Sequence, residues 1–368
     1  MNQIGHYTIK KWLKVTHIAA CLLSVPLYAL SPGKLVTFDK FSYHGHVYFN
    51  ASHSGVAGEK YLLNQQISNV KLYSDYQLFN DSKLHTLLIY NSAPNPILPG
   101  LYFEQAYLDV HHPLPTHMNI ELGKKWVAFG NYKNDLIYKP LTKALGQTNA
   151  YTMVIGYDDY HYANFSLYQP HSKIQSSTLP VYYNVNAGVH NDILDLGVSY
   201  IYSLADSQLF QYNKGFGGYL GKSVSGHVPG KAAYINFKHN HFNTNLTYVS
   251  AVNEFQMNEL SYQNKPAKPA AFSVQSGYEF NIKDIRYKVI GFYDKSYQAL
   301  ALKLPEQRAG VGLNLYPNRW LDVQFQYSQD YSYPTNAIAS GLNNTVNKSV
   351  KGNSGITNTL ALQLIFNF

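Results

Sequence analysis

The segment LDVQFQYS, residues 321–328, alternates without a break between apolar and polar side chains. Its odd-numbered positions carry Leu, Val, Phe and Tyr, whereas its even-numbered positions carry Asp, Gln, Gln and Ser. Because successive side chains of a strand point to opposite faces of a sheet, this period of two predicts a β-strand with one apolar and one polar face. A strand of a soluble β-sandwich has the same local pattern, so the rest of the chain has to decide between the two.

The same alternation recurs along the chain, for example in residues 194–202, 272–280 and 285–293. The polar faces of these segments hold mostly Asn, Gln, Ser, Thr and Gly, with few of the Lys and Glu residues that cover a soluble sheet. Such faces suit the packed or water-filled lumen of a transmembrane barrel. The alternation predicts sixteen strands, near residues 41–50, 69–79, 84–91, 103–110, 117–123, 151–157, 161–169, 181–190, 193–203, 231–239, 241–250, 271–281, 284–293, 306–316, 320–330 and 356–368.

The connections between these strands fall into two length classes, as they do in bacterial outer-membrane barrels. The short connections, which we expect to be periplasmic turns, are residues 158–160, 239–240, 282–283 and 317–319. The long polar connections, which we expect to be extracellular, are residues 51–68, 92–102, 204–230, 251–270 and 331–355.

Composition supports the same class of protein. The chain has 368 residues, of which 45% are hydrophobic, 15% are aromatic and only 14% are charged, yet its mean hydropathy is −0.26. No apolar run approaches the roughly 20 residues that a membrane-spanning helix needs, and the low charge excludes a disordered chain or a coiled coil. The predicted fold class is therefore all-β, a transmembrane antiparallel β-barrel of about sixteen strands with no plug domain.

The N-terminus predicts export. Lys10, Lys11 and Lys14 precede a short apolar run that ends near Ala29, which is typical of a secretory signal peptide over residues 1–29. A buried N-terminal helix and a lipoprotein cleavage site at Cys21 are the alternatives. Removal of this leader would remove the only Cys of the chain, so we expect neither disulfides nor thiol chemistry.

The predicted domains after the leader are a short periplasmic segment, residues 30–40, and the barrel, residues 41–368. A segment as short as residues 30–40 excludes the large N-terminal plug domain of an energy-coupled transporter. The formal net charge of +8 is spread thinly along the chain, whereas nucleic-acid binding proteins cluster Lys and Arg on one face. No nucleic-acid partner is predicted.

The last segment of the chain carries the sharpest signal of location. Leu360, Leu362, Leu364, Phe366 and Phe368 fall on one face of the predicted final strand, and Phe368 is the terminal residue. A closing strand that ends in an aromatic residue resembles the signal read by outer-membrane assembly machinery. This predicts a lipid-embedded barrel in the outer membrane of a Gram-negative bacterium, with a soluble edge strand as the alternative.

Several strings form an ordered set between residue 100 and the end of the chain. The central string is ELGKKWVAFG at residues 121–130, followed by Asn134 and by KPLTKALGQT at residues 139–148. Further strings of the set are residues 104–107, 265–267, 299–302, 304–308 and 330–332. Together they resemble the LbtU-family siderophore porins. Ala128 and Lys139 depart from the pattern of that family, which has Pro and Asp there.

The resemblance implies a sixteen-stranded barrel that takes up a ferric siderophore without a plug or an energy-coupling box. The function it implies is therefore an outer-membrane porin for iron acquisition, whose partner is a ferric siderophore or another small anionic solute. Two alternatives stay open from the residues themselves. One is a general or anion-selective porin with no iron role, and the other is a surface adhesion or structural barrel. The oligomeric state is not predicted.

The segment between the fifth and sixth predicted strands, residues 124–149, is the candidate constriction. It carries Asp135 as its single acidic residue against five lysines, which are Lys124, Lys125, Lys133, Lys139 and Lys143. A segment folded into the lumen with this charge would attract an anionic ferric chelate, whereas a solvated surface loop is the alternative. Residues 140–146 could form a short helix inside the barrel.

A second charged set is predicted on the later strands. Arg286 and Lys288, opposed by Asp284, are expected to line the lumen near Glu306 and Arg308. Such a set can be a charged ladder along the pore or a structural network of ion pairs.

Motifs for other chemistry are missing from the sequence. The fifteen His residues include pairs such as His44 and His46, but none has the spacing and the carboxylate of a defined metal site. The sequence contains no Gly-x-Ser-x-Gly, no His-Glu-x-x-His and no phosphate-binding loop. Neither an enzyme nor a bound metal or cofactor is predicted.

Overall fold

The computed structural model describes most of the chain from residue 40 onward. The described residues are 40–56, 62–93, 99–111, 117–170, 173–174, 181–212, 223–224, 226–341 and 348–368. The predicted leader, residues 1–29, and the predicted periplasmic segment except its last residue lie outside them. Both therefore stay predictions.

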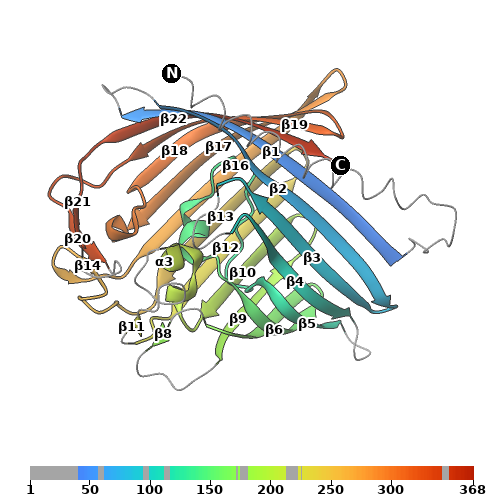
Figure 1. Cartoon of the computed structure of the whole chain (residues 1–368), viewed down its shortest axis with the longest axis horizontal. Coiled ribbons are helices and arrows are strands. Elements are labelled where there is room, and N and C mark those ends of the chain that lie inside the picture. The colour runs from blue at the N-terminus through green and yellow to red at the C-terminus, as the bar shows by residue number, and fades with distance from the viewer. Residues whose placement is uncertain are drawn as a thin grey trace, which may run out of the picture. The chain divides into compact units, whose positions relative to one another are not determined.

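Sixteen antiparallel strands close into one barrel, in which each strand pairs with the next barrel strand of the chain (Figure 1). The prediction of a sixteen-stranded β-barrel is confirmed, and every predicted strand overlaps an observed one. The barrel strands are β1 (Phe41–Val56), β2 (Leu62–Phe79), β3 (Ser82–Asn91), β4 (Leu101–His111), β5 (Met118–Trp126), β6 (Asn149–Asp158), β7 (His161–Tyr168), β9 (Tyr182–His190), β10 (Leu194–Ile201), β12 (Gly230–His239), β13 (Phe242–Ala251), β16 (Ala270–Ile282), β17 (Ile285–Tyr297), β18 (Gln307–Asn318), β19 (Leu321–Tyr331) and β22 (Ile356–Asn367).

The final strand closes the barrel by pairing on both of its edges. Leu364 of β22 lies opposite Val323 of β19 and opposite Phe49 of β1. The terminal residue extends this pairing, because the Phe368 N–H donates to the Gly45 carbonyl and the Gly45 N–H donates to the Phe368 carbonyl. A side chain at Gly45 would lie 2.3 Å from the Phe368 ring, so this close approach requires glycine. The role of Phe368 in assembly stays a prediction.

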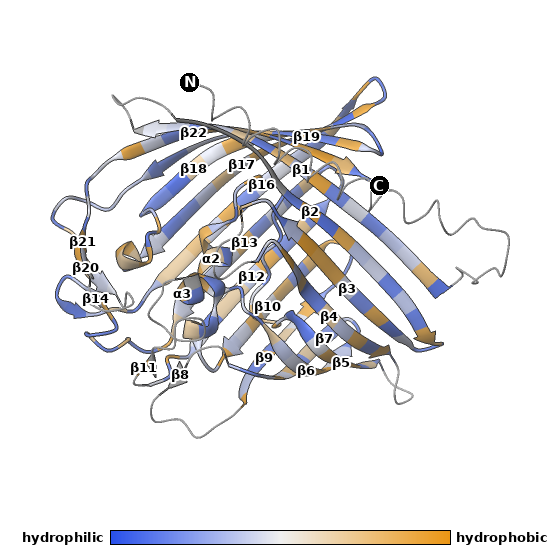
Figure 2. Ribbon diagram, in the orientation of Figure 1, coloured by the Kyte–Doolittle hydropathy of each residue, from blue (hydrophilic) through white to orange (hydrophobic). Residues whose placement is uncertain are grey.

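The alternation that predicted the strands separates the two faces of the barrel wall. In Figure 2 hydrophobic and hydrophilic bands follow one another along the strands. On β19 and β22 the side chains of Phe325 and Leu360 are 42% and 57% exposed on the outside. Gln326 and Gln363 point inward and are only 2% and 8% exposed. Apolar side chains therefore cover the face that lipid contacts, and amides line the lumen.

The two ends of the barrel differ as predicted. At one end the connections are tight, for example residues 80–81, 159–160, 240–241 and 283–284. At the other end they are long and carry additional elements, and we assign this end to the extracellular side by the general rule for such barrels. These additional elements are α2 (Leu141–Gly146), β8 (Lys173–Ile174), η2 (Leu204–Asp206), α3 (Gln208–Tyr212), β11 (Ser223–Val224), β14 (Leu260–Tyr262), β15 (Lys265–Pro266), η4 (Leu300–Leu302), β20 (Ile338–Gly341) and β21 (Lys348–Lys351).

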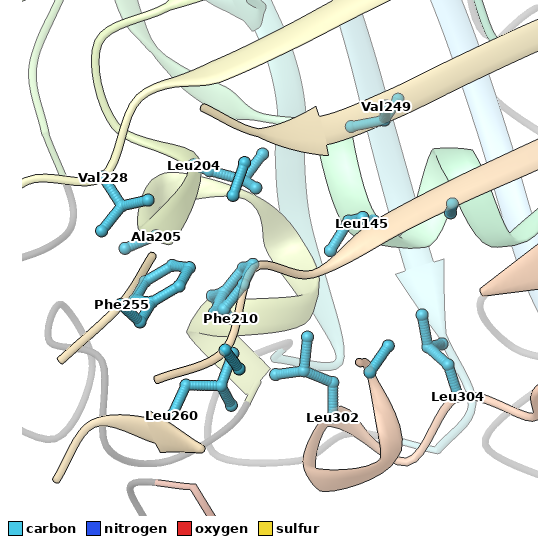
Figure 3. Packing of buried hydrophobic residues seen from close by; sticks show 14 of the residues in the cluster. Leu145, Leu204, Ala205, Phe210, Val228, Val249, Phe255, Leu260, Leu302 and Leu304 are labelled. Atoms are coloured by element: carbon cyan, nitrogen blue, oxygen red, sulfur yellow. The ribbon is translucent and has the colours of Figure 1, made fainter. Parts of the chain in front are cut away.

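The long connections are not merely polar loops, because they share an apolar core that we call the extracellular core (Figure 3). Phe210 of α3 stacks on Phe255 with 5.1 Å between ring centroids. Leu145 of α2, Leu260 of β14 and Leu302 of η4 belong to the same buried cluster. Burial of these side chains gives the connections a folded structure of their own. None of the helices in the described part of the chain is long and apolar enough to cross a membrane.

Candidate pore constriction

Residues 127–148, which connect β5 to β6, fold into the barrel, and we call them the inward segment. The two ends of the segment are joined at the wall, where the Val127 N–H donates to the Thr148 carbonyl at 2.9 Å. Its second half forms α2, Leu141–Gly146, as predicted for residues 140–146. The predicted constriction segment was too long by a few residues, because β5 continues to Trp126 and β6 begins at Asn149.

Asp135 anchors the first half of the inward segment. Its Oδ2 accepts hydrogen bonds from Lys288 Nζ at 2.8 Å, Gln275 Nε2 at 3.2 Å and Asn243 Nδ2 at 3.3 Å. These three partners belong to β17, β16 and β13. Lys288 is buried and also contacts Glu279 at 3.1 Å, so one lysine holds two carboxylates together beneath the segment.

The main chain of the inward segment takes its hydrogen bonds from inward-facing side chains of the barrel wall. The N–H groups of Ile137 and Tyr138 donate to Gln326 Oε1 at 3.0 and 3.3 Å. Asn314 Nδ2 donates to the Asp135 carbonyl at 2.8 Å. The polar face of these strands therefore satisfies a backbone that would otherwise be buried without partners.

The inward segment lies on one side of the lumen. Its contacts run from Ser199 of β10, whose hydroxyl accepts from the Gly130 N–H at 3.0 Å, to Gln326 of β19. We call the lumen face of β10 to β19 the covered wall and that of β1 to β4 the bare wall. In the closed order of strands β3 and β13 stand eight places apart among sixteen, so the two walls face each other across the barrel.

The five predicted lysines do not come together. Lys125 forms an ion pair with Glu121 and lies 4.6 Å from the centre of the Tyr107 ring. Lys133 contacts Asp195 at 3.6 Å. Each of these two charges therefore has a carboxylate next to it.

Lys124 does not lie on the lumen side with its neighbour. It stands opposite Tyr151, a side chain that is 60% exposed on the outer face, and it donates to the Phe103 carbonyl at 2.8 Å. Alternation along β5 necessarily places Lys124 and Lys125 on opposite faces. Both lysines belong to β5, which ends at Trp126, so the prediction that they lie in the connecting segment was wrong.

Lys139 and Lys143 remain, and they face the bare wall. Both interact electrostatically with Lys71 of β2 and with Glu104 of β4. Among the described residues, none of these three lysines has a carboxylate oxygen within 4.0 Å. Burial lowers the pKa of Lys143 to about 8, and the nearby charges of Lys139 and Lys71 lower it further against the opposing effect of Glu104. We take this group of four residues as the candidate constriction.

Sequence reasoning missed two members of this group. Lys71 stands on the polar face of a predicted strand, but nothing local shows that the inward segment comes opposite to it. Glu104 lies where the register between β3 and β4 shifts, between the pairs Leu87 with Gln105 and Leu88 with Phe103. A β-bulge of this kind changes which face a side chain takes and leaves no clear sequence signal.

The second predicted charged set is split by the strand register. Lys288 lies opposite Asn314, whereas Arg308 lies opposite Asp294, six residues farther along β17. Arg308 forms a bidentate pair with Asp330 at 2.6 and 2.7 Å, and its Nη1 is 3.4 Å from the Lys139 carbonyl. Lys288 and Arg308 therefore lie apart along the wall, each in an ion pair of its own, and the two basic groups fix the inward segment at separate points.

The outer members of that set lie away from the inward segment. Arg286 is exposed near the β16–β17 turn, with its guanidinium 4.1 Å from the centre of the Tyr316 ring. Glu306 lies in the β17–β18 connection, where its N–H donates to the Tyr331 carbonyl at 2.9 Å. Within the part of the chain that the structure describes, no three His, Cys, Asp or Glu side chains are placed to hold a metal ion.

Two kinds of comparison place this barrel among known proteins. No family model matches the sequence. A UPF0422 protein of Coxiella burnetii is 28% identical over 278 residues, which cover 70% of this chain and 57% of that protein. A UPF0422 protein of Legionella pneumophila strain Paris is 26% identical over 300 residues, which cover 75% of this chain and 56% of that protein. The chain therefore spans little more than half the length of these relatives.

Solved structures with the same fold are outer-membrane proteins. The anion-selective porin of Comamonas acidovorans superposes with a TM-score of 0.57 over 89% of this chain and 99% of its own, at 10% identity. OmpF of Salmonella typhi, solved with daunomycin, gives 0.56 over 91% of this chain and 100% of its own, at 10% identity. This is a porin-like barrel of the Gram-negative outer membrane. At such low identity the similarity shows the fold of the porin-like barrel and leaves its solute open.

Proposed function

We propose that this porin-like barrel lets small anionic solutes cross the outer membrane, and that its physiological cargo is a ferric siderophore. The observation that supports this most directly is the excess of positive charge at the candidate constriction. Among the described residues, Lys71, Lys139 and Lys143 stand there with Glu104 as the acidic group that interacts with all three. A pore lined by one sign of charge concentrates solutes of the opposite sign.

The other cations of the lumen differ from the lysines of the candidate constriction, and this difference supports the proposed anion channel. Lys125, Lys133, Lys288 and Arg308 each have a carboxylate within 4.0 Å, so their field is largely cancelled a short distance away. Lys71, Lys139 and Lys143 have no carboxylate oxygen within 4.0 Å among the described residues, so their field is cancelled less. The proposed channel is non-enzymatic, since it needs only this field and an open path.

The siderophore part of the proposal rests on the resemblance of residues 121–148 to siderophore porins, together with the sign of the charge at the constriction. A general anion-selective porin is the second candidate, supported by the same lysines. A siderophore porin would bind the ferric chelate during its passage through the channel, whereas a general anion-selective porin would not.

Planar-bilayer recording with a salt gradient tests the anion channel. The reversal potential of the purified protein should show anion preference, and the double variant Lys139→Gln, Lys143→Gln should lose most of it. Lys268→Gln is the matched control, because Lys268 is exposed in the β13–β16 connection, and it should change the potential little. An absence of conductance would favour an adhesion or structural barrel instead.

Uptake of radioactive iron tests the cargo. Cells with and without the gene are compared in low iron with the ferric siderophore that they themselves secrete. Slower uptake and growth without the gene are expected. Equal uptake, together with anion currents that the ferric siderophore does not block, would leave a general anion-selective porin.

A further inference from the structure

The bare wall carries four aromatic side chains in a row, which we call the ring lane. They are His44, His46 and Tyr48 of β1 and Tyr73 of β2. The register with β22 places His46 opposite Asn367 and Tyr48 opposite Ile365, which are inward positions of that strand. Three alternate positions of one strand span about 13 Å, so the ring lane runs from the level of the constriction toward the N-terminal end of β1.

The rings of this lane are arranged face to face and edge to face. His44 stacks on Tyr73 with 4.7 Å between ring centroids and 5° between the planes. His46 stands edge-on to Tyr73 at 5.7 Å and to Tyr48 at 6.0 Å. The lane ends at the constriction, because Lys71 Nζ lies 4.9 Å from the centre of the Tyr48 ring.

A second aromatic stack on the neighbouring strands shows what a purely structural arrangement looks like. His85 stacks on Tyr107 with 4.9 Å between centroids. His85 also contacts Asp75 at 2.6 Å, and the cation above Tyr107, Lys125, is paired with Glu121. Rings and charges in this stack are all engaged with one another.

The ring lane differs from that stack in its charges. Among the described residues, Lys71 has no carboxylate oxygen within 4.0 Å. His44 is exposed to the lumen, and His46, Tyr48 and Tyr73 are half-buried. The lane therefore offers ring faces and edges with a cation at one end that has Glu104 nearby but no carboxylate oxygen at ion-pair distance among the described residues.

We propose that the ring lane and Lys71 bind planar aryl anions, such as an arene that carries a carboxylate or a phenolate, as they pass through the channel. An arene can pack offset or edge-on against the Tyr and His rings, while its anionic group approaches Lys71. Aromatic faces alone would also attract organic cations, but Lys71 repels them here. This inference rests on the proposed anion channel and adds the class of solute that is retained longest.

A block experiment with two carboxylates of equal charge and similar size tests the proposal. Chloride current through the protein in a planar bilayer is titrated with benzoate and with cyclohexanecarboxylate. Benzoate should block at a concentration about fivefold lower, the order expected for one aromatic pair. A hydrophobic pocket would favour the more apolar cyclohexanecarboxylate, so the direction of the difference is diagnostic.

Variants assign the effect to the ring lane. Tyr48→Leu with Tyr73→Leu should bring the two blocking concentrations together, and His44→Ala should reduce their ratio by a smaller amount. Tyr107→Leu, in the second stack, is the matched control and should keep the ratio of the parent protein. Folding of each variant is checked by the shift in electrophoretic mobility on heating.

Two results would overturn the ring lane. One is equal block of the parent protein by both carboxylates, and the other is loss of the difference in Tyr107→Leu as complete as in the double variant. The reversal potential is recorded in the same bilayers and reports on the anion channel separately. A parent protein with clear anion preference and no aryl preference would refute the ring lane and leave the proposed function standing.

Discussion

The covered wall and the bare wall are built from the same kinds of residue, yet their charges do different work. On the covered wall Lys288 bridges Asp135 and Glu279, and Arg308 is paired with Asp330. On the bare wall Lys71 has no such partner among the described residues. The inward segment adds to this difference, because it brings Asp135 to one wall and presents Lys139 and Lys143 to the other, whereas Glu279 and Asp330 belong to the covered wall itself.

Whether a charge in the lumen fixes the fold or sets the field of the pore therefore depends on which groups lie opposite to it. A cation next to a carboxylate fixes a fold, whereas a cation facing two further cations sets the field of the pore. Amides follow the same division. Gln275 and Gln326 are 5% and 2% exposed because they bind the inward segment.

The largest expected effect comes from loosening the extracellular core that holds α2 against the covered wall. Phe210 is fully buried and stacks on Phe255, so Phe210→Ala leaves a cavity that costs about 3–5 kcal/mol. We expect hydrogen exchange of the amides of α2, in the inward segment, to speed up by as much as the corresponding factor. Met257→Ala, at a side chain that is 51% exposed in the β13–β16 connection, should change exchange little. Unaltered exchange in Phe210→Ala would show that this core does not hold the segment.

A smaller effect is expected from removing the main ionic anchor of the covered wall. Asp135→Ala takes away the acceptor of three hydrogen bonds and leaves Lys288 with Glu279 alone. Because Asp135 is 35% exposed and one carboxylate remains, the cost is about 1–3 kcal/mol. Exchange of the amides at residues 135–138 should rise, and single-channel conductance should become larger and noisier. Asp284→Asn, an exposed carboxylate of the β16–β17 turn, serves as control and should leave both readouts unchanged.

A pH titration of anion preference probes the side of the inward segment that faces the bare wall. Lys143 has a pKa lowered to about 8 by burial and by Lys139 and Lys71. It is therefore charged at pH 6.5 and largely neutral at pH 9, so anion preference should fall as the pH rises. Removing one of several nearby charges changes the permeability ratio by about two- to threefold.

Two variants of the same residue make this titration decisive. Lys143→Arg keeps its charge throughout and should hold a high, pH-independent preference, whereas Lys143→Gln should hold a low one. If the anion preference of Lys143→Arg still falls as the pH rises, the titrating group lies elsewhere in the channel.

The strands were predictable from sequence because each of them is specified locally. Alternation such as that of residues 321–328 needs only the period of two, and lipid outside with amides inside preserves it all around the barrel. The candidate constriction was predictable only in part. Lys139 and Lys143 were identified, but Lys71 depends on which wall the inward segment covers, and that choice is made by Asp135 meeting Lys288 more than 150 positions away along the chain.

The extracellular core escaped prediction for a different reason. Its members, such as Leu204, Phe210, Phe255 and Leu302, come from short apolar groups in three separate connections that also carry polar residues. They have neither the period of a helix nor that of a strand, so no single connection shows that it will be buried. Only their assembly at one end of the barrel creates the core.

The smallest expected effect concerns Arg286, a cation that lies outside the constriction and has no carboxylate oxygen within 4.0 Å among the described residues. Its guanidinium rests on the Tyr316 ring near the β16–β17 turn, where solvent surrounds it. Salt largely screens the field of an exposed charge beyond about 10 Å, so Arg286→Gln should change the permeability ratio less than Lys143→Gln does. Loss of the contact with the Tyr316 ring should lower the free energy of unfolding by about 0.5 kcal/mol. Arg286→Lys keeps the charge but loses the planar contact. The expected pattern is a stability change in both variants, with a permeability ratio that is unaltered in Arg286→Lys and changes little in Arg286→Gln. A change in anion preference as large as that of Lys143→Gln would mean that any unpaired lumen cation sets selectivity, and the distinction between the constriction and the rest of the pore would fail.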